Sequence, residues 1–280
     1  MENAKSPSML LIDAGNTRVK WAVPASVPEA ALTSACAARW LHTGSAERAA
    51  LAELAQQWAA AAESLNLSRV VISNVAGPGL RDALDALLRQ SLGDALRIEW
   101  FASQPECAGL RNRYRNPAQL GCDRFAAAIG ARALFPAQDL IVATCGTATT
   151  VDAVSADGRF LGGMILPGLG TMATSLALTT AQLPQIHEIG ALSAPFADNT
   201  VDAIVAGCIA AQAGAIERAV ATQLALSVKQ AGGVAAQVRC VLAGGAGAIV
   251  APYLTLPGAQ LEKVDNLVLI GLHTVAMQTD

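Results

Sequence analysis

Short apolar runs, polar turns and longer amphipathic segments alternate along the chain and predict a mixed α/β protein. Met9–Ile12 has the pattern of a buried strand that enters the polar turn Asp13–Thr17, and Val19–Val23 alternates like a second strand. The next elements expected are a helix, a strand, a helix and a strand at residues 45–64, 70–72, 80–92 and 97–101. The first half therefore opens with a hairpin that has a polar tip.

The second half repeats this order. A helix at 124–134 and an apolar strand at 140–143 lead into the turn Thr144–Thr147, and setting Leu10 on Ile141 places Gly15 on Gly146. Asp157-Gly158 is a strong hairpin-turn signal between strands at 149–154 and 159–165. The remaining expected elements are a helix at 201–226, a strand at 238–242, a helix from 247 and a helix after 265. We expect two α/β domains, 1–120 and 121–280.

Composition narrows the class of protein. The 280 residues are 53% hydrophobic and 15% charged, as in a well-packed globular chain. A net charge of -3 offers no basic face for nucleic acid. Polar or charged residues interrupt each long apolar stretch, as Asp202, Gln212 and Glu217 do in the richest one, so we expect no membrane span.

The cysteines and the first residues of the chain point to the cytoplasm. The six cysteines form no C-x-x-C pair, which suits free thiols in a reducing compartment. The first nine residues lack the pattern of an export signal. His42, His187 and His273 are too scattered for a local metal motif.

The two glycine-containing hairpin tips are candidates for phosphate binding, since backbone N–H groups in such turns form concave anion sites. Each tip alone is equally well an ordinary turn, and the repeat favours phosphate. Asp13, at the end of a buried strand, needs a cation or donors, and Mg²⁺ on nucleotide phosphates would supply one. Lys20 is either a phosphate ligand or an exposed strand lysine.

Two further segments carry candidate chemistry. Asp123 and Arg124 open an apolar helix. Asp123 is either a reactive carboxylate or an N-cap or first-turn carboxylate, and Arg124 is either a ligand for an anion or a solvated neighbour. The glycine run within Leu242–Gly247 would let a planar adenine approach the backbone, or is simply a strand-to-helix turn.

Taken together, these segments resemble the type III pantothenate kinases of the hexokinase, acetate kinase and actin superfamily. The resemblance runs over nearly the whole chain, through D-x-G-N-T-x-x-K at Asp13–Lys20, Y-x-N-P-x-x-L-G-x-D-R at Tyr114–Arg124, G-T-A-x-T at Gly146–Thr150, G-G-x-I-x-P-G at Gly162–Gly168, T-A-x-L-P at Thr180–Pro184 and G-G-x-G at Gly244–Gly247. It implies two ribonuclease H-like domains with duplicated topology, and ATP and substrate in the cleft between them.

The resemblance also implies an activity, which is ATP-dependent phosphorylation of pantothenate to 4'-phosphopantothenate, the first step of coenzyme A biosynthesis. It implies a homodimer that uses Mg²⁺ and a monovalent cation, K⁺ or NH₄⁺. The implied proton acceptor is Asp123, and the implied metal ligand is Asp13. The ATP-binding residues are expected to be Asp13, Ala14, Gly15, Asn16, Thr17, Arg18, Val19, Lys20, Thr147, Gly244 and Gly245, and the substrate-binding residues Tyr114, Gly121, Cys122, Asp123, Arg124 and Thr180.

One position departs from the family pattern. The second phosphate turn usually begins with Asp, which is linked to the monovalent cation, and here that residue is Thr144. A neutral oxygen ligand binds such an ion more weakly, so we expect the dependence on K⁺ or NH₄⁺ to be shallow.

Two alternative functions share some of these features. A kinase of the same superfamily that acts on acetate or a sugar fits the two phosphate turns but not the segments Gly121–Arg124 and Thr180–Pro184. A non-enzymatic accessory factor for gene regulation fits poorly with the negative net charge and the lack of a helix-turn-helix signature.

Overall fold

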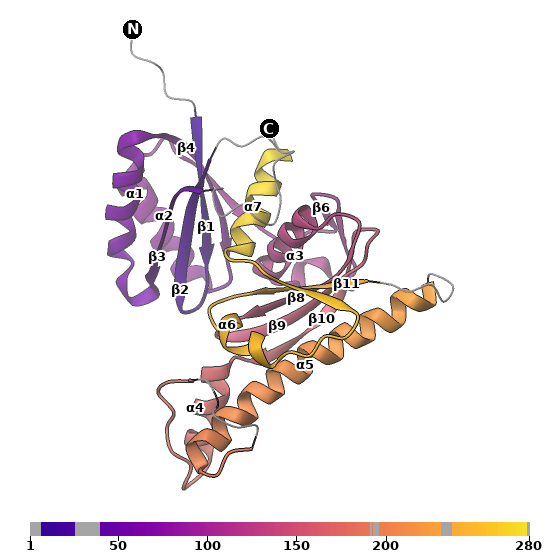
Figure 1. Cartoon of the computed structure of the whole chain (residues 1–280). Helices are drawn as coiled ribbons and strands as arrows, with labels where there is room; N and C mark the ends of the chain where they lie inside the picture. The colour runs from indigo at the N-terminus through magenta and orange to yellow at the C-terminus, as the bar shows by residue number, and fades with distance from the viewer. Residues whose placement is uncertain (1–6, 26–39, 191, 193–195, 231–236, 279–280) are drawn as a thin grey trace. The chain divides into compact units, whose positions relative to one another are not determined.

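The computed structural model describes residues 7–25, 40–190, 192, 196–230 and 237–278. Its contacts divide the chain into two compact units, Met1–Phe135 with Leu267–Asp280, and Pro136–Asn266 (Figure 1). The division falls after Phe135 and not after residue 120, because the helix at 122–134 packs with the first unit. The last helix of the chain also belongs to the first unit.

The first unit is a sheet with helices on both faces. Its strand order is β3-β2-β1-β4-β5, in which β1, β2 and β3 are antiparallel neighbours and β4 and β5 continue the sheet parallel to β1. The strands are β1 Pro7–Ala14, β2 Arg18–Pro24, β3 Trp40–Glu47, β4 Asn66–Asn74 and β5 Arg97–Phe101, with a short hairpin of β6 Glu106–Cys107 and β7 Leu110–Asn112. The helices are α1 Ala52–Ser64, α2 Pro78–Leu92, α3 Cys122–Leu134 and α7 Leu267–Gln278.

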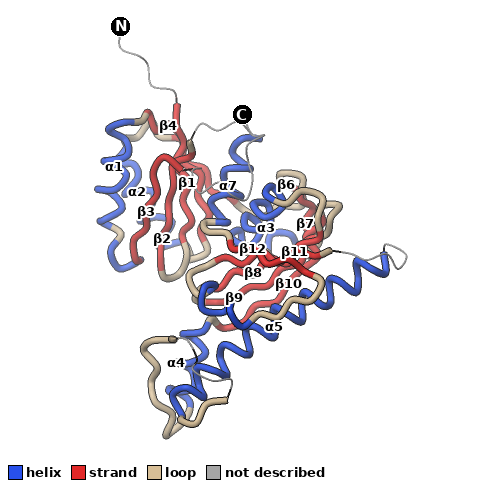
Figure 2. The backbone as a smooth tube through the Cα atoms, viewed as in Figure 1, coloured by secondary structure: helices blue, strands red, loops and turns tan. Residues whose placement is uncertain are grey.

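The second unit repeats this topology. Its neighbouring strands run in the order β10-β9-β8-β11-β12, again with an antiparallel meander followed by two parallel strands (Figure 2). The strands are β8 Asp139–Cys145, β9 Ala148–Val154, β10 Arg159–Pro167, β11 Val238–Ala243 and β12 Ala259–Lys263. The helices are α4 Leu169–Thr179, α5 Thr200–Gln230 and α6 Gly247–Val250. The predicted duplication of an α/β topology is therefore confirmed.

Side-chain alternation along β1 separates a structural face from a functional face. Leu10 and Ile12 belong to the core that α1 and α2 cover, together with Trp58 and Leu84. Since successive residues of a strand point to opposite faces, Leu11 and Asp13 face the other way. Helices α3 and α7 pack on β4 and β1 at this second face.

Helices α3 and α7 pack backbone to backbone. A Cβ atom on Gly271 would lie 1.8 Å from the carbonyl oxygen of Ala126, and one on Gly130 would lie 2.5 Å from that of Leu267. The end of α7 is held by Arg69 of β4, which donates to the carbonyl of Ala276 at 3.1 Å. Arg69 also donates to both carboxylate oxygens of Glu99 on β5, at 2.8 and 3.0 Å. These contacts make α7 an integral part of the first unit.

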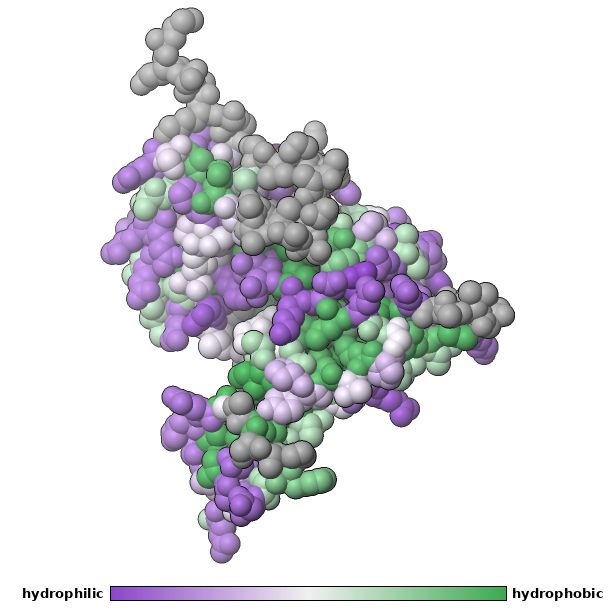
Figure 3. Space-filling view, viewed as in Figure 1, coloured by the Kyte–Doolittle hydropathy of each residue, from purple (hydrophilic) through white to green (hydrophobic). Residues whose placement is uncertain are grey.

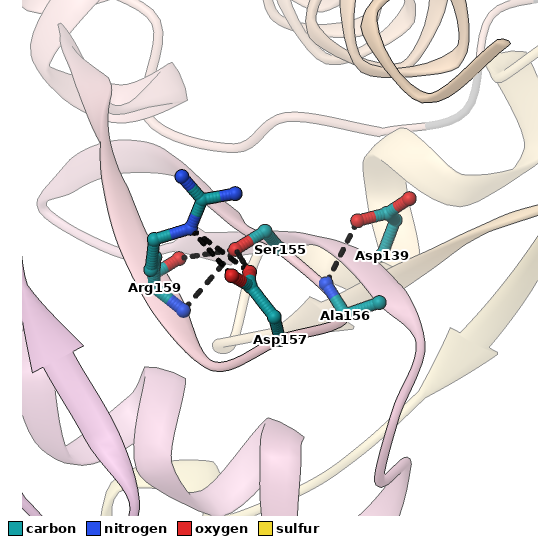
Figure 4. Close-up of polar contacts among 5 residues, drawn as sticks. All are labelled: Asp139, Ser155, Ala156, Asp157 and Arg159. Atoms are coloured by element: carbon teal, nitrogen blue, oxygen red, sulfur yellow. Dashed lines mark hydrogen bonds and ion pairs between the residues drawn. The ribbon is translucent and has the colours of Figure 1, made fainter. Parts of the chain in front are cut away.

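The predicted turn at Asp157-Gly158 is confirmed. Gly158 has φ of 78°, and the N–H of Arg159 donates to the Ser155 hydroxyl at 3.1 Å. The Arg159 guanidinium pairs with Asp157, and the N–H of Ala156 donates to Asp139 on β8 at 2.8 Å (Figure 4). Side chains thus close both ends of this hairpin loop.

The hydrophobic pattern of the sequence did not predict several elements at the sheet edges. The helix expected at 45–64 begins at Ala52, because residues 45–47 end strand β3. Strand β3 lies at a sheet edge, and Ala46 is its one buried residue, so its apolar alternation is faint. The short strands β6, β7 and β12 and helix α4 were also not predicted. Cys36 lies outside the described residues.

Helix α5 corrects the expectation that no apolar segment is long enough to span a membrane. By length and composition alone, residues 200–229 are long and apolar enough. One face of this helix packs on the core of the second unit through Ile209, Ile216 and Val220. The buried Gln212 side chain accepts from Thr149 on β9 and donates to the carbonyl of Pro167, at 2.7 and 2.8 Å. These contacts are those of a core helix.

The close contact of α3 and α7 yields a stability prediction. Gly271→Ala should destabilise the protein by about 1–3 kcal/mol or more, because the added methyl group has to displace backbone atoms. Urea denaturation would measure this change. Gly214→Ala is the matched control, since Gly214 lies in helix α5 with open space around its Cα, and it should stabilise by up to about 1 kcal/mol. Equal effects of the two variants would contradict the packing argument.

Candidate active site

The first phosphate-binding candidate is the hairpin tip between β1 and β2. The N–H of Gly15 donates to the carbonyl of Arg18 at 3.1 Å, and the side chains of Asn16, Thr17 and Arg18 are exposed. Lys20 on β2 stands opposite Asp13 in the antiparallel register, which places both side chains on the same face of the sheet. The sequence-predicted segment Asp13–Lys20 therefore forms one polar end of the first unit.

Asp13 sits in an environment that disfavours its negative charge. Burial of the carboxyl group is the main reason that the pKa of Asp13 rises from 3.8 to about 7. The charge of Asp123 raises this pKa further, and that of Lys20 lowers it. Asp13 and Asp123 are thus close enough to repel each other, although they lie far apart in the chain. The site carries more negative charge than Lys20 offsets.

Asp123 lies in the first turn of α3. Gly121 precedes the helix as its N-cap residue, and a Cβ atom there would lie 2.7 Å from Oδ1 of Asp123. The Asp123 carboxylate accepts from the backbone N–H of Arg124 at 2.8 Å. Burial raises the pKa of Asp123, and the hydrogen bond and charge of Arg124 oppose that rise. The carboxylate is therefore partly desolvated, and it is a first-turn carboxylate of α3, whose N-cap residue is Gly121.

Arg124 is buried, with 7% of its surface exposed, so it is not the solvated neighbour that one interpretation of the sequence allowed. It donates to the hydroxyl of Tyr114 at 2.9 Å, and its guanidinium lies 5.7 Å from the centre of the Tyr114 ring. Tyr114 is held in turn by Asn112, whose side chain accepts from the Tyr114 N–H and donates to the carbonyl of Pro117. Tyr114, Asp123 and Arg124 are thus brought together.

The second unit gathers three glycine segments around the turn between β8 and β9. A Cβ atom on Gly168 would lie 2.1 Å from the carbonyl oxygen of Gly146, and one on Gly244 would lie 2.3 Å from that of Cys145. Gly244 has φ of 88°, which favours glycine. The carbonyl of Thr147 accepts from the Gly168 N–H and from the Thr171 hydroxyl. Backbone surfaces meet here without intervening side chains.

The remaining predicted residues of the second unit lie at the ends of elements. Gly245 follows β11 next to Gly244, and Thr144 lies in β8 opposite Thr150 of β9. Thr180 is the exposed C-cap residue of α4, and its hydroxyl donates to the carbonyl of Leu176 at 2.7 Å.

Comparison with known proteins identifies the family. The model of the type III pantothenate kinase family matches residues 9–222. The chain belongs to the type III pantothenate kinase family. A type III pantothenate kinase from Janthinobacterium sp. (strain Marseille) is 55% identical over 272 residues, which cover 96% of this chain and 98% of that protein. A type III pantothenate kinase from Herminiimonas arsenicoxydans is 53% identical over 271 residues, which cover 97% of this chain and 98% of that protein. Membership makes the chain an enzyme, a phosphotransferase.

A solved structure supports the fold class. A candidate 2-dehydro-3-deoxygalactonokinase from Sinorhizobium meliloti aligns with a TM-score of 0.57 at 16% identity, covering 97% of this chain and 99% of that one. This likeness in fold agrees with the strand order of each unit, which gives two α/β units of duplicated topology.

Sequence reasoning missed two residues that the structure places beside the candidate site. Ser73 ends β4 in parallel register with Asp13, and its hydroxyl lies 3.3 Å from Sγ of Cys122. Asn74 follows it, and its side chain holds the next turn by accepting from the Ala76 N–H and donating to the carbonyl of Gly77. Asp13 is a candidate because it is a polar residue at the end of a buried strand, and Ser73 and Asn74 follow a buried strand in the same way.

The raised pKa of Asp13 has a consequence for stability. Between about pH 4 and pH 7 the folded protein keeps a proton on Asp13 that the unfolded chain has lost, so this group lowers stability as pH rises through that window. Asp13→Asn should therefore raise the melting temperature at pH 8 by at least about 2 °C and leave it nearly unchanged at pH 4. Scanning calorimetry at the two pH values would measure this.

The matched control for that prediction is Asp82→Asn, which changes an exposed carboxylate on α2. It should leave the melting temperature unaltered at both pH values. A lower melting temperature for Asp13→Asn at pH 8 would mean that the ionised carboxylate stabilises the fold, against the argument from burial.

Proposed function

We propose that this protein is a pantothenate kinase that transfers the γ-phosphoryl group of ATP to the primary hydroxyl of pantothenate, forming 4'-phosphopantothenate in the first step of coenzyme A biosynthesis. Family membership supports this activity, and the observation that carries the chemistry is a partly desolvated carboxylate next in the chain to a buried arginine. Asp123 and Arg124 share one helix turn beside Tyr114. A proton acceptor thus lies next to a group that recognises carboxylates.

The proposed role of Asp123 is to accept the proton of the pantothenate hydroxyl. Phosphoryl transfer passes through a loose transition state, so a base has to receive the proton late and the main tasks are positioning and charge stabilisation. Burial raises the pKa of Asp123 towards the working pH, which improves a general base. The short span from Gly121 to Asp123 turns the carboxylate back over the start of the helix.

The proposed role of Arg124 is to bind the pantothenate carboxylate through its planar fork of donors. The Tyr114 hydroxyl and ring orient the guanidinium. Gly121 and Cys122 complete this segment by presenting backbone, and Thr180 is the proposed additional contact for pantothenate.

The proposed nucleotide contacts are made by the backbone and side chains of Asp13–Lys20 together with Thr147, Gly244 and Gly245. Backbone N–H groups of a glycine turn suit phosphate oxygens, and Lys20 supplies a point charge. Gly244 packs against the backbone of Cys145, whereas a Cβ atom on Gly245 would meet nothing within 4 Å, and such open backbone is what approach of a flat base would need.

Magnesium fits this site as a partner of the phosphates. Among residues 7–25, 40–190, 192, 196–230 and 237–278, no three His, Cys, Asp or Glu side chains form a group that would hold a metal ion alone. Asp13 carries a carboxylate whose charge is poorly offset, and Mg²⁺ commonly binds through one or two carboxylates plus substrate phosphates. Asp13 would hold the ion, which would neutralise phosphate charge when bound.

We propose further that the protein is a cytoplasmic homodimer. Leu178 and Phe196 are 79% and 93% exposed, and apolar side chains gather on the surface around α4 in the space-filling view (Figure 3). A surface groove of about 790 Å³ between α4 and the start of α5 adjoins them. Large exposed apolar surfaces favour association. The five described cysteines are free thiols, which supports a reducing compartment.

One assay of ADP formation tests the activity of the unmodified protein and the roles of Asp123 and Arg124. The unmodified protein should form ADP from ATP with pantothenate and not with acetate or glucose. Asp123→Asn should lower kcat by about 10²–10⁴, the usual contribution of a general base. Arg124→Ala should mainly raise the KM for pantothenate, by about tenfold or more, through loss of a charge-assisted pair. A coupled assay of ADP formation measures all three.

Arg115→Ala is the matched control for that experiment, because Arg115 is an exposed arginine next to Tyr114 and should leave both constants within about twofold. Turnover of acetate or glucose in place of pantothenate would overturn the proposed substrate. Wild-type kcat in Asp123→Asn would remove Asp123 from the proposed base role.

The monovalent cation is proposed to act weakly here. Thr144 stands where the family usually has Asp, so a K⁺ or NH₄⁺ site has one charged ligand fewer. Omitting K⁺ should lower the rate less than omitting Mg²⁺, and Thr144→Asp should strengthen activation by K⁺ while changing the KM for pantothenate little. Initial rates against K⁺ concentration in sodium-free buffer test this. A steep K⁺ requirement that Thr144→Asp leaves unaltered would show that other oxygens build the cation site.

A further inference from the structure

The thiol of Cys122 joins the first turn of α3 to the end of β4. Its Sγ lies 3.3 Å from Oγ of Ser73 and donates to the carbonyl of Asn74 at 3.5 Å. Because the thiol hydrogen goes to Asn74, the Ser73 hydroxyl is the donor to Sγ. Ser73, Cys122 and Asn74 then form a short chain of hydrogen bonds. Burial raises the pKa of the Cys122 thiol, which keeps its proton available for Asn74.

The position of Ser73 makes this chain relevant to the chemistry. Ser73 is completely buried, and its partner in the parallel register is Asp13, so both side chains lie on the face of the sheet covered by α3. Cys122 is the residue directly before Asp123. The bond between Ser73 and Cys122 therefore connects the strand beside Asp13 to the helix turn that carries Asp123.

The same strand end is tied to β1. The N–H of Val75 donates to the carbonyl of Ala14 at 3.2 Å, directly after Asp13, and the Asn74 side chain closes the turn that follows. The strand ends that carry Asp13 and Ser73 are thus bonded to each other. The attachment of α3 to them through Cys122 then sets the separation between the two carboxylates.

We propose that Ser73 is a positioning residue for the kinase reaction, which holds Cys122 and so places the Asp123 carboxylate relative to Asp13. This inference rests on the proposed function. Thiol hydrogen bonds are weak, so their loss should cost little stability. Catalysis is more sensitive than stability, because a displacement of about 1 Å in a reacting group can cost up to about 10² in rate.

The experiment compares Ser73→Thr with Ser73→Val. The two side chains have nearly the same shape, so any effect of volume at this buried position is shared, and only Thr keeps the hydroxyl. We expect the kcat of Ser73→Val to be about tenfold lower than that of Ser73→Thr, with KM for ATP within about twofold and similar melting temperatures. Ser73→Ala removes the hydroxyl without adding volume, and its kcat should be as low as that of Ser73→Val. If Ser73→Val does not fold, Ser73→Ala is compared with Ser73→Thr instead.

Ser227→Ala is the control for loss of a buried serine hydroxyl in general. Ser227 lies in α5 of the second unit, is 6% exposed and donates to Asp139 at 2.6 Å. It should lower the melting temperature and leave kcat within about twofold. Equal kcat in Ser73→Thr, Ser73→Val and Ser73→Ala would overturn the positioning role, as would equal loss of kcat in Ser227→Ala. An unmodified protein without pantothenate kinase activity would instead overturn the proposed function.

Discussion

Helix α3 has to be held in place at both of its ends, because its first turn carries Asp123 and Arg124. Near its end, Gly130 and Gly271 bring its backbone against α7 at a distance that no side chain would allow. At its start, the thiol of Cys122 bonds to Ser73 and Asn74 at the end of β4. Since packed backbone leaves little freedom to shift, the helix presents its first turn to the strand ends in one arrangement.

That arrangement concentrates negative charge at one end of the first unit. Two carboxylates approach each other, burial raises the pKa of each, and Lys20 offsets part of the charge at Asp13. Such a site is costly without a ligand and becomes favourable when a cation arrives with phosphates. The two buried carboxylates thus cause both the electrostatic cost of the site and its proposed affinity for a cation with phosphates.

The second unit uses the same fold for a different purpose. Its turn between β8 and β9 occupies the place that the Asp13 turn has in the first unit, yet Thr144 stands where the first unit has a carboxylate. The surroundings of this turn consist of backbone from Gly168 and Gly244, and Gln212 ties the adjoining strand to α5. One topology thereby provides a charged end in one unit and a turn packed backbone to backbone in the other.

The class of fold, the repeat and the residue types of the site can all be predicted from the amino-acid sequence. Periodicity located the central strands and helices, because buried positions leave a strong apolar pattern, and the motifs from Asp13 to Gly247 were enough to indicate the family. The edge strand β3 was not predicted, since half-exposed strands carry little apolar alternation. Only the tertiary structure decided that Arg124 is buried against Tyr114 and that α7 returns to the first unit. The contact of Ser73 with Cys122 is likewise a tertiary one. None of these contacts follows the period of a helix or a strand, so local patterns carry no information about them.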